Sequence, residues 1–284
     1  GLNSPFATRD HGKTTSIPIV LALWRQACNH DITQCFVGYK LDLPKLRLRR
    51  IKREVERNQR LQDDFGLYPD RKAGWDTEKL FFVRTKEHIV PSMFCYGIAS
   101  GGTGHHMNYM YWDDVVTIEN SASVTLRESI QNTVGMSVYP QVEPGGQLVC
   151  VGTPKYIEDL YSTFADFDTE TSKSPAWRCY FYPAYREDKG EETEVLWPER
   201  YSYKALQGKR DQLIAEYGIL GERMYIQEYL LRPHALGGEE FKDEWLQFYD
   251  PITPHVNLDN YPHYIFTDPA SGERDQSSYS ATVV

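Results

Sequence analysis

The chain has 284 residues, and 31 Lys and Arg against 40 Asp and Glu give a formal net charge of −9. Hydrophobic residues make up 40% and charged residues 25%, which excludes a disordered or fibrous protein. The longest apolar run covers only residues 17–24, whereas a helix that spans a bilayer needs roughly 20 residues. The length predicts about two domains of roughly 100–200 residues each.

Apolar, β-branched and aromatic runs alternate with helical patterns along the chain, which is typical of an α/β domain. The predicted elements, in chain order, are a helix over 13–28, a strand over 33–39, a helix over 45–61, strands over 80–84, 93–98 and 107–112, a helix over 123–133, a strand over 147–152, a helix over 158–166, a strand over 177–182, helices over 202–217 and 222–230, a linker helix over 239–249, and a hairpin of strands over 263–267 and 279–284. The hairpin has no partner strand within the chain, so we interpret it as the start of a second domain.

The first motif is a candidate phosphate-binding loop with the pattern G-x-x-x-x-G-K-[ST], in which Ala replaces the first Gly. It consists of Ala7, Thr8, Arg9, Asp10, His11, Gly12, Lys13 and Thr14. In such a loop, backbone N–H groups at a helix N-terminus surround phosphate oxygens. Lys13 would reach the β- and γ-phosphates, and the Thr14 hydroxyl would bind Mg²⁺. The alternative is a helix start with an exposed lysine.

Two features disagree with this motif. Only residues 1–6 precede it, so the strand expected before the loop is predicted to be nearly absent. Pro18 lies in the second turn of the predicted helix, where its missing N–H removes a backbone hydrogen bond.

A second motif supplies carboxylates. Residues 107–112 are largely apolar and end at Asp113 and Asp114. Asp113 would hold Mg²⁺ through its water shell, and Asp114 would orient or deprotonate an attacking water. The alternative is that one of these acids caps the following helix or turn. The predicted strand over 147–152 leads to Thr153. One interpretation is that Thr153 contacts the γ-phosphate, and the alternative is that it is only part of a turn.

These motifs together resemble the large terminase subunits of tailed bacteriophages. The matching segments are residues 9–15, 103–114, 151–154 with 159–161, 196–201 with 227–229, and 264–270 with 278–281. The resemblance implies a P-loop NTPase fold of the ASCE type, in which a parallel central sheet is flanked by helices. One extra strand would separate the phosphate loop from the Asp-Asp strand. The implied domains are an ATPase over 1–235 with a lid over 155–235, a linker over 236–261, and an incomplete RNase H-like nuclease over 262–284.

The resemblance implies an ATP-driven, Mg²⁺-dependent motor that packages double-stranded viral DNA into a procapsid. Arg9 would act in cis on the γ-phosphate, and Thr15 would complete the nucleotide-binding loop. Asp268 would be the first carboxylate of a nuclease site with two divalent metals, Mg²⁺ or Mn²⁺. The other acids are expected beyond Val284, so we expect endonuclease cutting of concatemeric DNA only in the full-length protein.

The implied partners are the portal protein of the procapsid, the small terminase subunit and further copies of the chain in a ring on the portal, with no membrane. The implied location is the host cytoplasm and transiently the procapsid, but not the mature virion. Two alternatives remain. One is another nucleic-acid-dependent ATPase, such as a helicase-like protein; the other is a non-catalytic structural subunit whose nucleotide site is degenerate.

Residues 45–60 form a basic segment with eight Lys or Arg against two Glu. Leu48, Ile51 and Val55 recur at helical spacing, which predicts a narrow apolar stripe opposite a basic face. The basic face is either a solvated surface or a contact for DNA phosphates or for the nucleotide of a neighbouring subunit.

Overall fold

A seven-stranded sheet, in the order β3-β4-β2-β5-β6-β1-β9, organises the first part of the chain. Its strands are β1 (Leu2–Ala7), β2 (Gln34–Gly38), β3 (Lys79–Leu80), β4 (Met93–Gly97), β5 (Met107–Asp113), β6 (Val142–Val151) and β9 (Trp177–Tyr182). All neighbouring strands are parallel except for the edge pair of β3 and β4. The predicted α/β fold with a mostly parallel central sheet is therefore confirmed.

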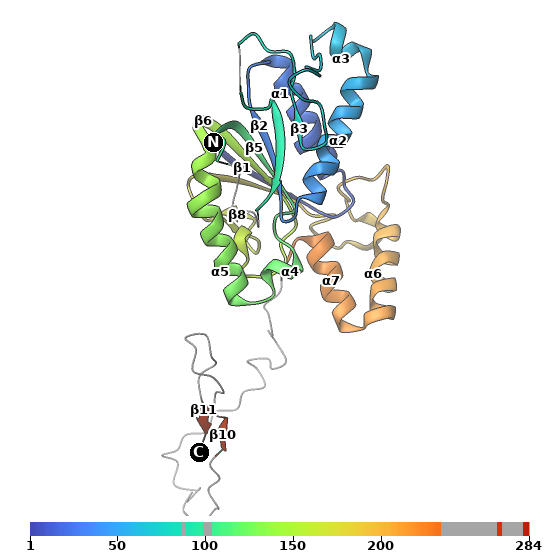
Figure 1. Cartoon of the computed structure of the whole chain (residues 1–284). Coiled ribbons are helices and arrows are strands. Elements are labelled where there is room, and N and C mark those ends of the chain that lie inside the picture. The colour runs from blue at the N-terminus through green and yellow to red at the C-terminus, as the bar shows by residue number, and fades with distance from the viewer. Residues whose placement is uncertain (87–88, 99–103, 234–265, 269–280, 284) are drawn as a thin grey trace, which may run out of the picture. The chain divides into compact units, whose positions relative to one another are not determined.

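The computed structural model describes residues 1–86, 89–98, 104–233, 266–268 and 281–283 (Figure 1). The chain divides into two compact units, Gly1–Gly238 and Glu239–Val284. Within the described ranges, no helix is both long enough and apolar enough to cross a membrane.

Strand β6 lies between β1 and β5, so one strand separates the loop after β1 from the two acids at the end of β5. This agrees with the predicted extra strand. The prediction that the first strand is nearly absent is wrong, because β1 has six residues and pairs with β9 along its whole length. Even a strand this short extends about 20 Å, which is an ordinary strand length. The parallel pairing brings the carboxyl ends of β1, β5 and β6 to one edge of the sheet.

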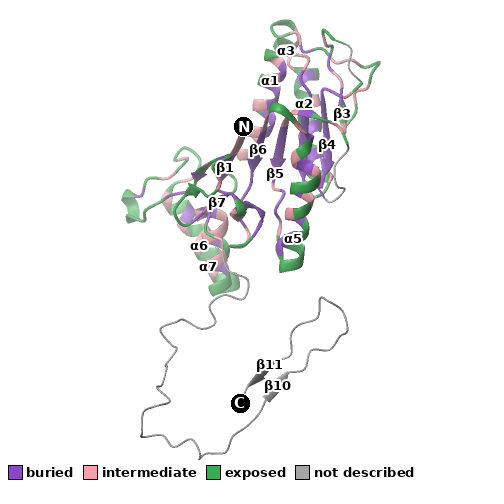
Figure 2. Ribbon diagram, turned by 90° about the vertical axis from the view of Figure 1, so that its left-hand side faces the viewer, coloured by how far each residue is buried: buried purple, intermediate pink, exposed green. Residues whose placement is uncertain are grey.

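Helices cover both faces of this sheet (Figures 1 and 2). The longer helices of the first unit are α1 (Ala22–Cys28), α2 (Asp42–Arg57), α5 (Val124–Thr133), α6 (Tyr203–Tyr217) and α7 (Ile219–Leu230), and its short ones are α3 (Gln59–Asp63) and α4 (Ile118–Ser121). Of the longer helices, α1 and α2 pack on one face and α5 on the other. Alternate residues of β5 point to opposite faces: Tyr111 packs in the cluster formed with α1 and α2, and Trp112 packs in the cluster that contains Ile130 of α5. The sheet is thus buried on both sides.

The predicted helix over 13–28 is present but irregular. A π-helical segment, Thr15–Leu21, precedes α1, and Pro18 lies inside it. Proline has no N–H to donate and collides with the carbonyl four residues back in a regular α-helix. The π-helical segment does not use the regular α-helical hydrogen-bond pattern at this position.

Other boundaries differ from the prediction. The helix predicted over 45–61 begins at Asp42 and is interrupted at Asn58, where the backbone is extended. The strand predicted over 80–84 is reduced to β3. The strand predicted over 147–152 begins at Val142 instead.

The helix predicted over 158–166 is wrong. The structure has a 3₁₀ turn at Leu160–Thr163, followed by β7 (Ala165–Asp166), which pairs with β8 (Thr171–Ser172). The Asp159 carboxylate accepts hydrogen bonds from four backbone N–H groups and holds the segment in this turn. Burial on successive residues, rather than on one helical face, accounts for the error.

Helices α6 and α7 form an antiparallel hairpin with a small core of its own, which contains Leu206, Tyr225 and Tyr229. The helices approach so closely that a Cβ on Gly221 would overlap the Leu213 carbonyl. Short 3₁₀ or π turns complete the unit at Val134–Val138, Tyr139–Gln141 and Gly190–Glu192. The range predicted as a lid, 155–235, contains this hairpin and also β9, which belongs to the central sheet.

In the second unit, β10 (Phe266–Asp268) and β11 (Ala281–Val283) pair in antiparallel fashion. These strands fall within the predicted hairpin, but whether it begins a nuclease domain stays a prediction. The predicted linker helix over 239–249 lies outside the described residues, and so does the side chain of Asp268.

Helix α2 is anchored through its apolar stripe, in which Leu48 is fully buried. We expect Leu48→Ala to lower the free energy of unfolding by about 2–5 kcal/mol, because it removes buried methyl groups and leaves a cavity. Leu46 on the same helix is 47% exposed, so Leu46→Ala should change the free energy of unfolding by less than about 0.5 kcal/mol. Urea unfolding followed by circular dichroism measures both, and equal effects would contradict this packing.

Candidate nucleotide-binding site

A cleft of about 710 Å³ opens where the carboxyl ends of β1, β5 and β6 meet. The predicted loop, the second acid of β5 and the turn after β6 all contribute to its walls. The lining residues among those predicted are Arg9, Asp10, Gly12, Lys13, Thr14, Thr15, Asp114 and Thr153. Residues from three separate motifs therefore share one cavity.

The loop after β1 has a tightly turned backbone. Asp10 and Gly12 both have positive φ, at 62° and 75°. Glycine adopts this conformation without strain, and the Asp side chain tolerates it better than most. The Gly12 carbonyl accepts a hydrogen bond from the Ser16 N–H at 2.9 Å, so the loop runs directly into the helical segment.

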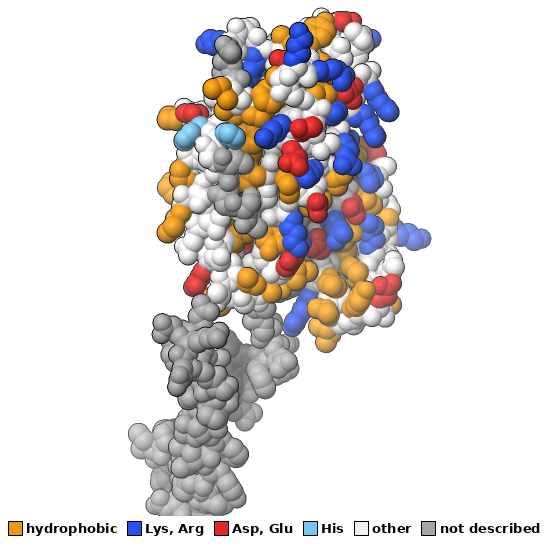
Figure 3. Space-filling model, in the orientation of Figure 1, with side chains coloured by type: hydrophobic (Ala, Val, Ile, Leu, Met, Phe, Trp, Pro, Cys, Tyr) orange, Lys and Arg blue, Asp and Glu red, His pale blue; other side chains and the backbone are white. Residues whose placement is uncertain are grey.

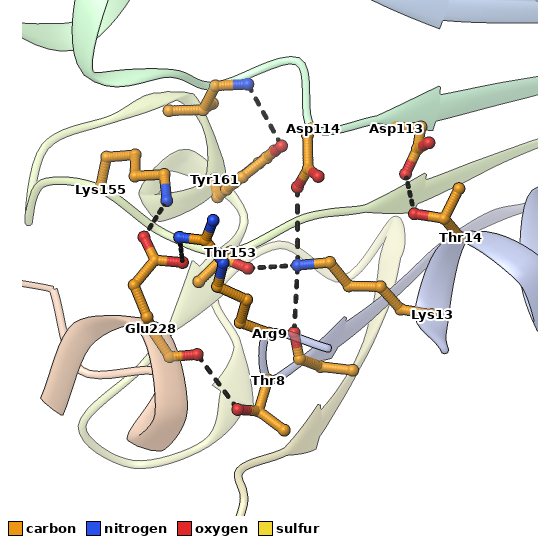
Figure 4. Close-up of polar contacts among 12 residues, drawn as sticks. Thr8, Arg9, Lys13, Thr14, Asp113, Asp114, Thr153, Lys155, Tyr161 and Glu228 are labelled. Carbon is orange, nitrogen blue, oxygen red and sulfur yellow. Dashed lines mark hydrogen bonds and ion pairs between the residues drawn. The ribbon is translucent and has the colours of Figure 1, made fainter. Parts of the chain in front are cut away.

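Lys13 lies at the centre of the site (Figure 4). Its side chain is only 11% exposed. The ammonium donates to the Ala7 carbonyl at 3.3 Å and to the Thr153 hydroxyl, and its Nζ lies 3.6 Å from Asp114 Oδ1. These three acceptors come from the ends of β1, β6 and β5, so one cation connects three strands.

Thr14 and Asp113 form a second contact beside Lys13 (Figure 4). The Thr14 hydroxyl donates to Asp113 Oδ1 at 3.0 Å. The other oxygen, Oδ2, accepts from Arg47 Nε at 2.6 Å. Burial and the adjacent Asp114 raise the pKa of Asp113, and the contacts with Arg47 and Thr14 partly oppose that shift.

The two neighbouring acids occupy different environments. The Asp113 side chain is 5% exposed, whereas the Asp114 side chain is 36% exposed and lines the cleft. Asp114 also has a positive φ of 50° and donates its N–H to the Val151 carbonyl of β6. This turn directs the second acid away from the buried position of the first.

Residues far along the chain hold the start of the loop. The Glu228 carbonyl in α7 accepts hydrogen bonds from the Thr8 hydroxyl at 3.1 Å and the Arg9 N–H at 3.0 Å. The Glu228 carboxylate pairs with Lys155 and lies 3.9 Å from Arg9 Nη1. The Arg9 side chain is 63% exposed at this edge of the cleft. Glu228 and Lys155 were not predicted as site residues, and no spacing in the sequence connects them to the loop.

Two predicted loop residues make other contacts. The His11 ring stacks on Tyr201 at 4.9 Å and lies edge-on to Trp197, and burial lowers its pKa. The Thr15 hydroxyl accepts from Arg50 Nη1 of α2 at 2.8 Å. His11 therefore packs against the segment before α6, while Thr15 joins the loop to α2.

The oxygen ligands present suit Mg²⁺ bound together with a phosphate. Across residues 1–86, 89–98 and 104–233, no three His, Cys, Asp or Glu side chains gather closely enough to hold a metal by themselves. Mg²⁺ commonly uses one or two protein oxygens and completes its shell with water and substrate phosphates. The adjacent Thr14 hydroxyl and Asp113 carboxylate provide such a pair.

No protein-family model and no curated protein matches this sequence. Among solved structures, the large terminase ATPase domain of Thermus phage P74-26 aligns with the chain at a TM-score of 0.48 and 12% identity. The alignment covers 81% of this chain and 88% of that one.

Gly152 forms the turn that presents Thr153. A Cβ at this position would overlap the Tyr161 ring and hydroxyl. We expect Gly152→Ala to destabilise the protein by about 1–3 kcal/mol, because a buried side chain must move to make room. Gly208→Ala in α6 is the control. A Cβ at Gly208 meets nothing within 4 Å, so this substitution should raise the free energy of unfolding by about 0.5–1 kcal/mol. Thermal unfolding distinguishes the two, and an unaltered melting temperature for Gly152→Ala would contradict the close contact.

Proposed function

We propose that this chain hydrolyses ATP in the presence of Mg²⁺ at the cleft between β1, β5 and β6. The observation that carries the proposal is the position of Lys13, whose largely buried ammonium meets acceptors from all three strands. A buried lysine that only stabilised the fold would not need an adjoining cleft lined by residues of the loop and by the partly exposed Asp114 carboxylate.

In this proposal the phosphate chain of ATP enters beside Lys13, and the ammonium exchanges its contact with Asp114 for phosphate oxygens. Thr14 and Asp113 hold Mg²⁺, which when bound neutralises charge on the phosphate oxygens. Arg9, at the edge of the cleft, reaches the γ-phosphate.

Asp114 then has a carboxylate free to orient a water against the γ-phosphorus. The new bond joins the water oxygen to that phosphorus, and the bond to the β–γ bridging oxygen breaks. The proton of the water passes to Asp114, and ADP leaves with the bonding electron pair. Thr153, which contacts Lys13, is placed to respond when the γ-phosphate departs.

We further propose that hydrolysis drives the packaging of double-stranded DNA into a procapsid. The order of the motifs across both units supports this, since the loop, the acids and Thr153 are followed by Asp268 on a strand. The proposed partners are the portal protein, the small terminase subunit and further copies of the chain in a ring, in the host cytoplasm. The proposed cutting activity needs two divalent metals, and Asp268 is proposed as the first of the carboxylates that bind them.

Two variants separate binding from hydrolysis. Lys13→Ala should weaken ATP binding by about 10- to 100-fold, because a charged hydrogen bond contributes about 1.5–3 kcal/mol. Asp114→Asn should retain binding and lower turnover by about 10²-fold or more, since it removes the group that accepts the proton. Calorimetric titration and phosphate release measure the two effects. Lys72→Ala and Asp211→Asn, both at exposed positions, are the controls.

An absence of ATP binding by the wild-type chain would contradict the proposal and favour a non-catalytic subunit. Turnover that survives Asp114→Asn would reject the role given to this carboxylate.

The DNA partner has its own test. Linear double-stranded DNA should stimulate ATP turnover, and the concentration for half-maximal stimulation should rise at least about tenfold between 50 and 200 mM salt, because phosphate contacts release counterions. Single-stranded DNA of equal length is the control. Stronger stimulation by the single strand would favour a helicase-like ATPase over a packaging motor.

A further inference from the structure

Arg47 in α2 makes the shortest contact to Asp113. Its Nε donates to Asp113 Oδ2 at 2.6 Å, and the side chains are 19% and 5% exposed respectively. The helical pattern of residues 45–60 predicts that this arginine lies on a basic face directed to solvent or to another molecule. The structure instead directs it inward, to the strand that carries the two acids.

The two acids of β5 thus have separate cations. Asp113 pairs with Arg47, and Asp114 pairs with Lys13. Adjacent carboxylates in a poorly solvated site repel each other, and each needs a nearby positive charge to remain ionised. If Lys13 engages phosphate, Arg47 is the cation that stays with Asp113.

The backbone of Arg47 is held firmly. It precedes Leu48, which is fully buried, and Ile51 and Val55 anchor the same helix against the sheet. One turn further on, Arg50 donates to the Thr15 hydroxyl. Two arginines on one face of α2 therefore contact the acidic strand and the end of the loop (Figure 4 shows the Asp113 and Thr14 side of this arrangement).

We propose that Arg47 is a positioning residue for the metal end of the site, an inference that rests on the proposed ATPase function. By holding Oδ2 of Asp113, it fixes the carboxylate so that Oδ1 faces the Thr14 hydroxyl. Removing a group that orients the ligands of a metal commonly lowers metal affinity by about 10- to 100-fold.

A purely structural role predicts a different result. Removing one partner of a buried ion pair destabilises the fold, because the other charge is left buried without compensation. A structural Arg47 would alter unfolding without altering the response of nucleotide binding to Mg²⁺. A positioning role changes that response in a chain that remains folded.

The test uses the full 284-residue chain with Arg47→Gln, Arg47→Lys and, as matched control, Arg53→Gln. Arg53 lies on the exposed side of α2 and has no ion-pair partner in the described part of the chain. A fluorescent N-methylanthraniloyl derivative of ATP is titrated first in EDTA and then at rising Mg²⁺, and circular dichroism checks folding.

We expect Arg47→Gln to bind the nucleotide in EDTA within about twofold of wild type, because Lys13 and the loop are intact. For Arg47→Gln, the Mg²⁺ concentration that gives half of the maximal enhancement of nucleotide binding should rise by about 10-fold or more. Arg47→Lys keeps the charge, so its half-maximal Mg²⁺ concentration should lie between those of wild type and Arg47→Gln. If Arg47→Gln does not fold, Arg47→Lys provides the measurement. Arg53→Gln should match wild type.

A double-mutant cycle with Asp113→Asn adds a second criterion. If Arg47 acts through Asp113, the double variant should be no worse in Mg²⁺ dependence than Asp113→Asn alone. Unchanged Mg²⁺ dependence in folded Arg47→Gln and Arg47→Lys, or fully additive effects, would overturn the inference while leaving the proposed ATPase intact. A wild-type chain that binds no nucleotide would instead overturn the proposed function together with this inference.

Discussion

The structure around the cleft depends on keeping a positive charge buried at Lys13. A buried ammonium is costly unless it is hydrogen-bonded and paired. The chain meets this requirement with a carbonyl from β1, a hydroxyl after β6 and a carboxylate after β5. These groups converge because the three strands are parallel neighbours, with β6 between the other two. The strand order and the burial of one charge are therefore two aspects of one constraint.

The same constraint explains the arrangement of charge on α2. In Figure 3, Lys and Arg side chains gather on the side of the molecule where α2 lies. Arg47 departs from the solvent-facing pattern of the helix, because it reaches the Asp113 carboxylate, whereas Arg50 stays exposed and contacts the Thr15 hydroxyl. The basic residues of α2 thus have two roles: Arg47 pairs with a buried acid, and others remain exposed to solvent.

The sequence predicted the parts of the fold that follow from local patterns. Strand β5 is a largely apolar run and β9 a largely aromatic one, and Ser123 and Ser202 cap helices that begin where they were predicted. The contacts of Arg47 and Glu228 could not be predicted, because they join residues 66 and 220 positions apart and neither contact has a spacing rule. The basic segment was assigned correctly to a helix, but helical periodicity does not specify which arginine turns inward.

The hydrogen bonds from the loop to Glu228 have a consequence for the order in which the molecule is made. The loop leaves the ribosome some 220 residues before its acceptor in α7 is synthesised. Contacts so distant in sequence form late and slow folding. The phosphate loop of a nascent chain therefore lacks one of its anchors until nearly all of the first unit has emerged, and a product that ends before α7 would carry the motif without the means to hold it.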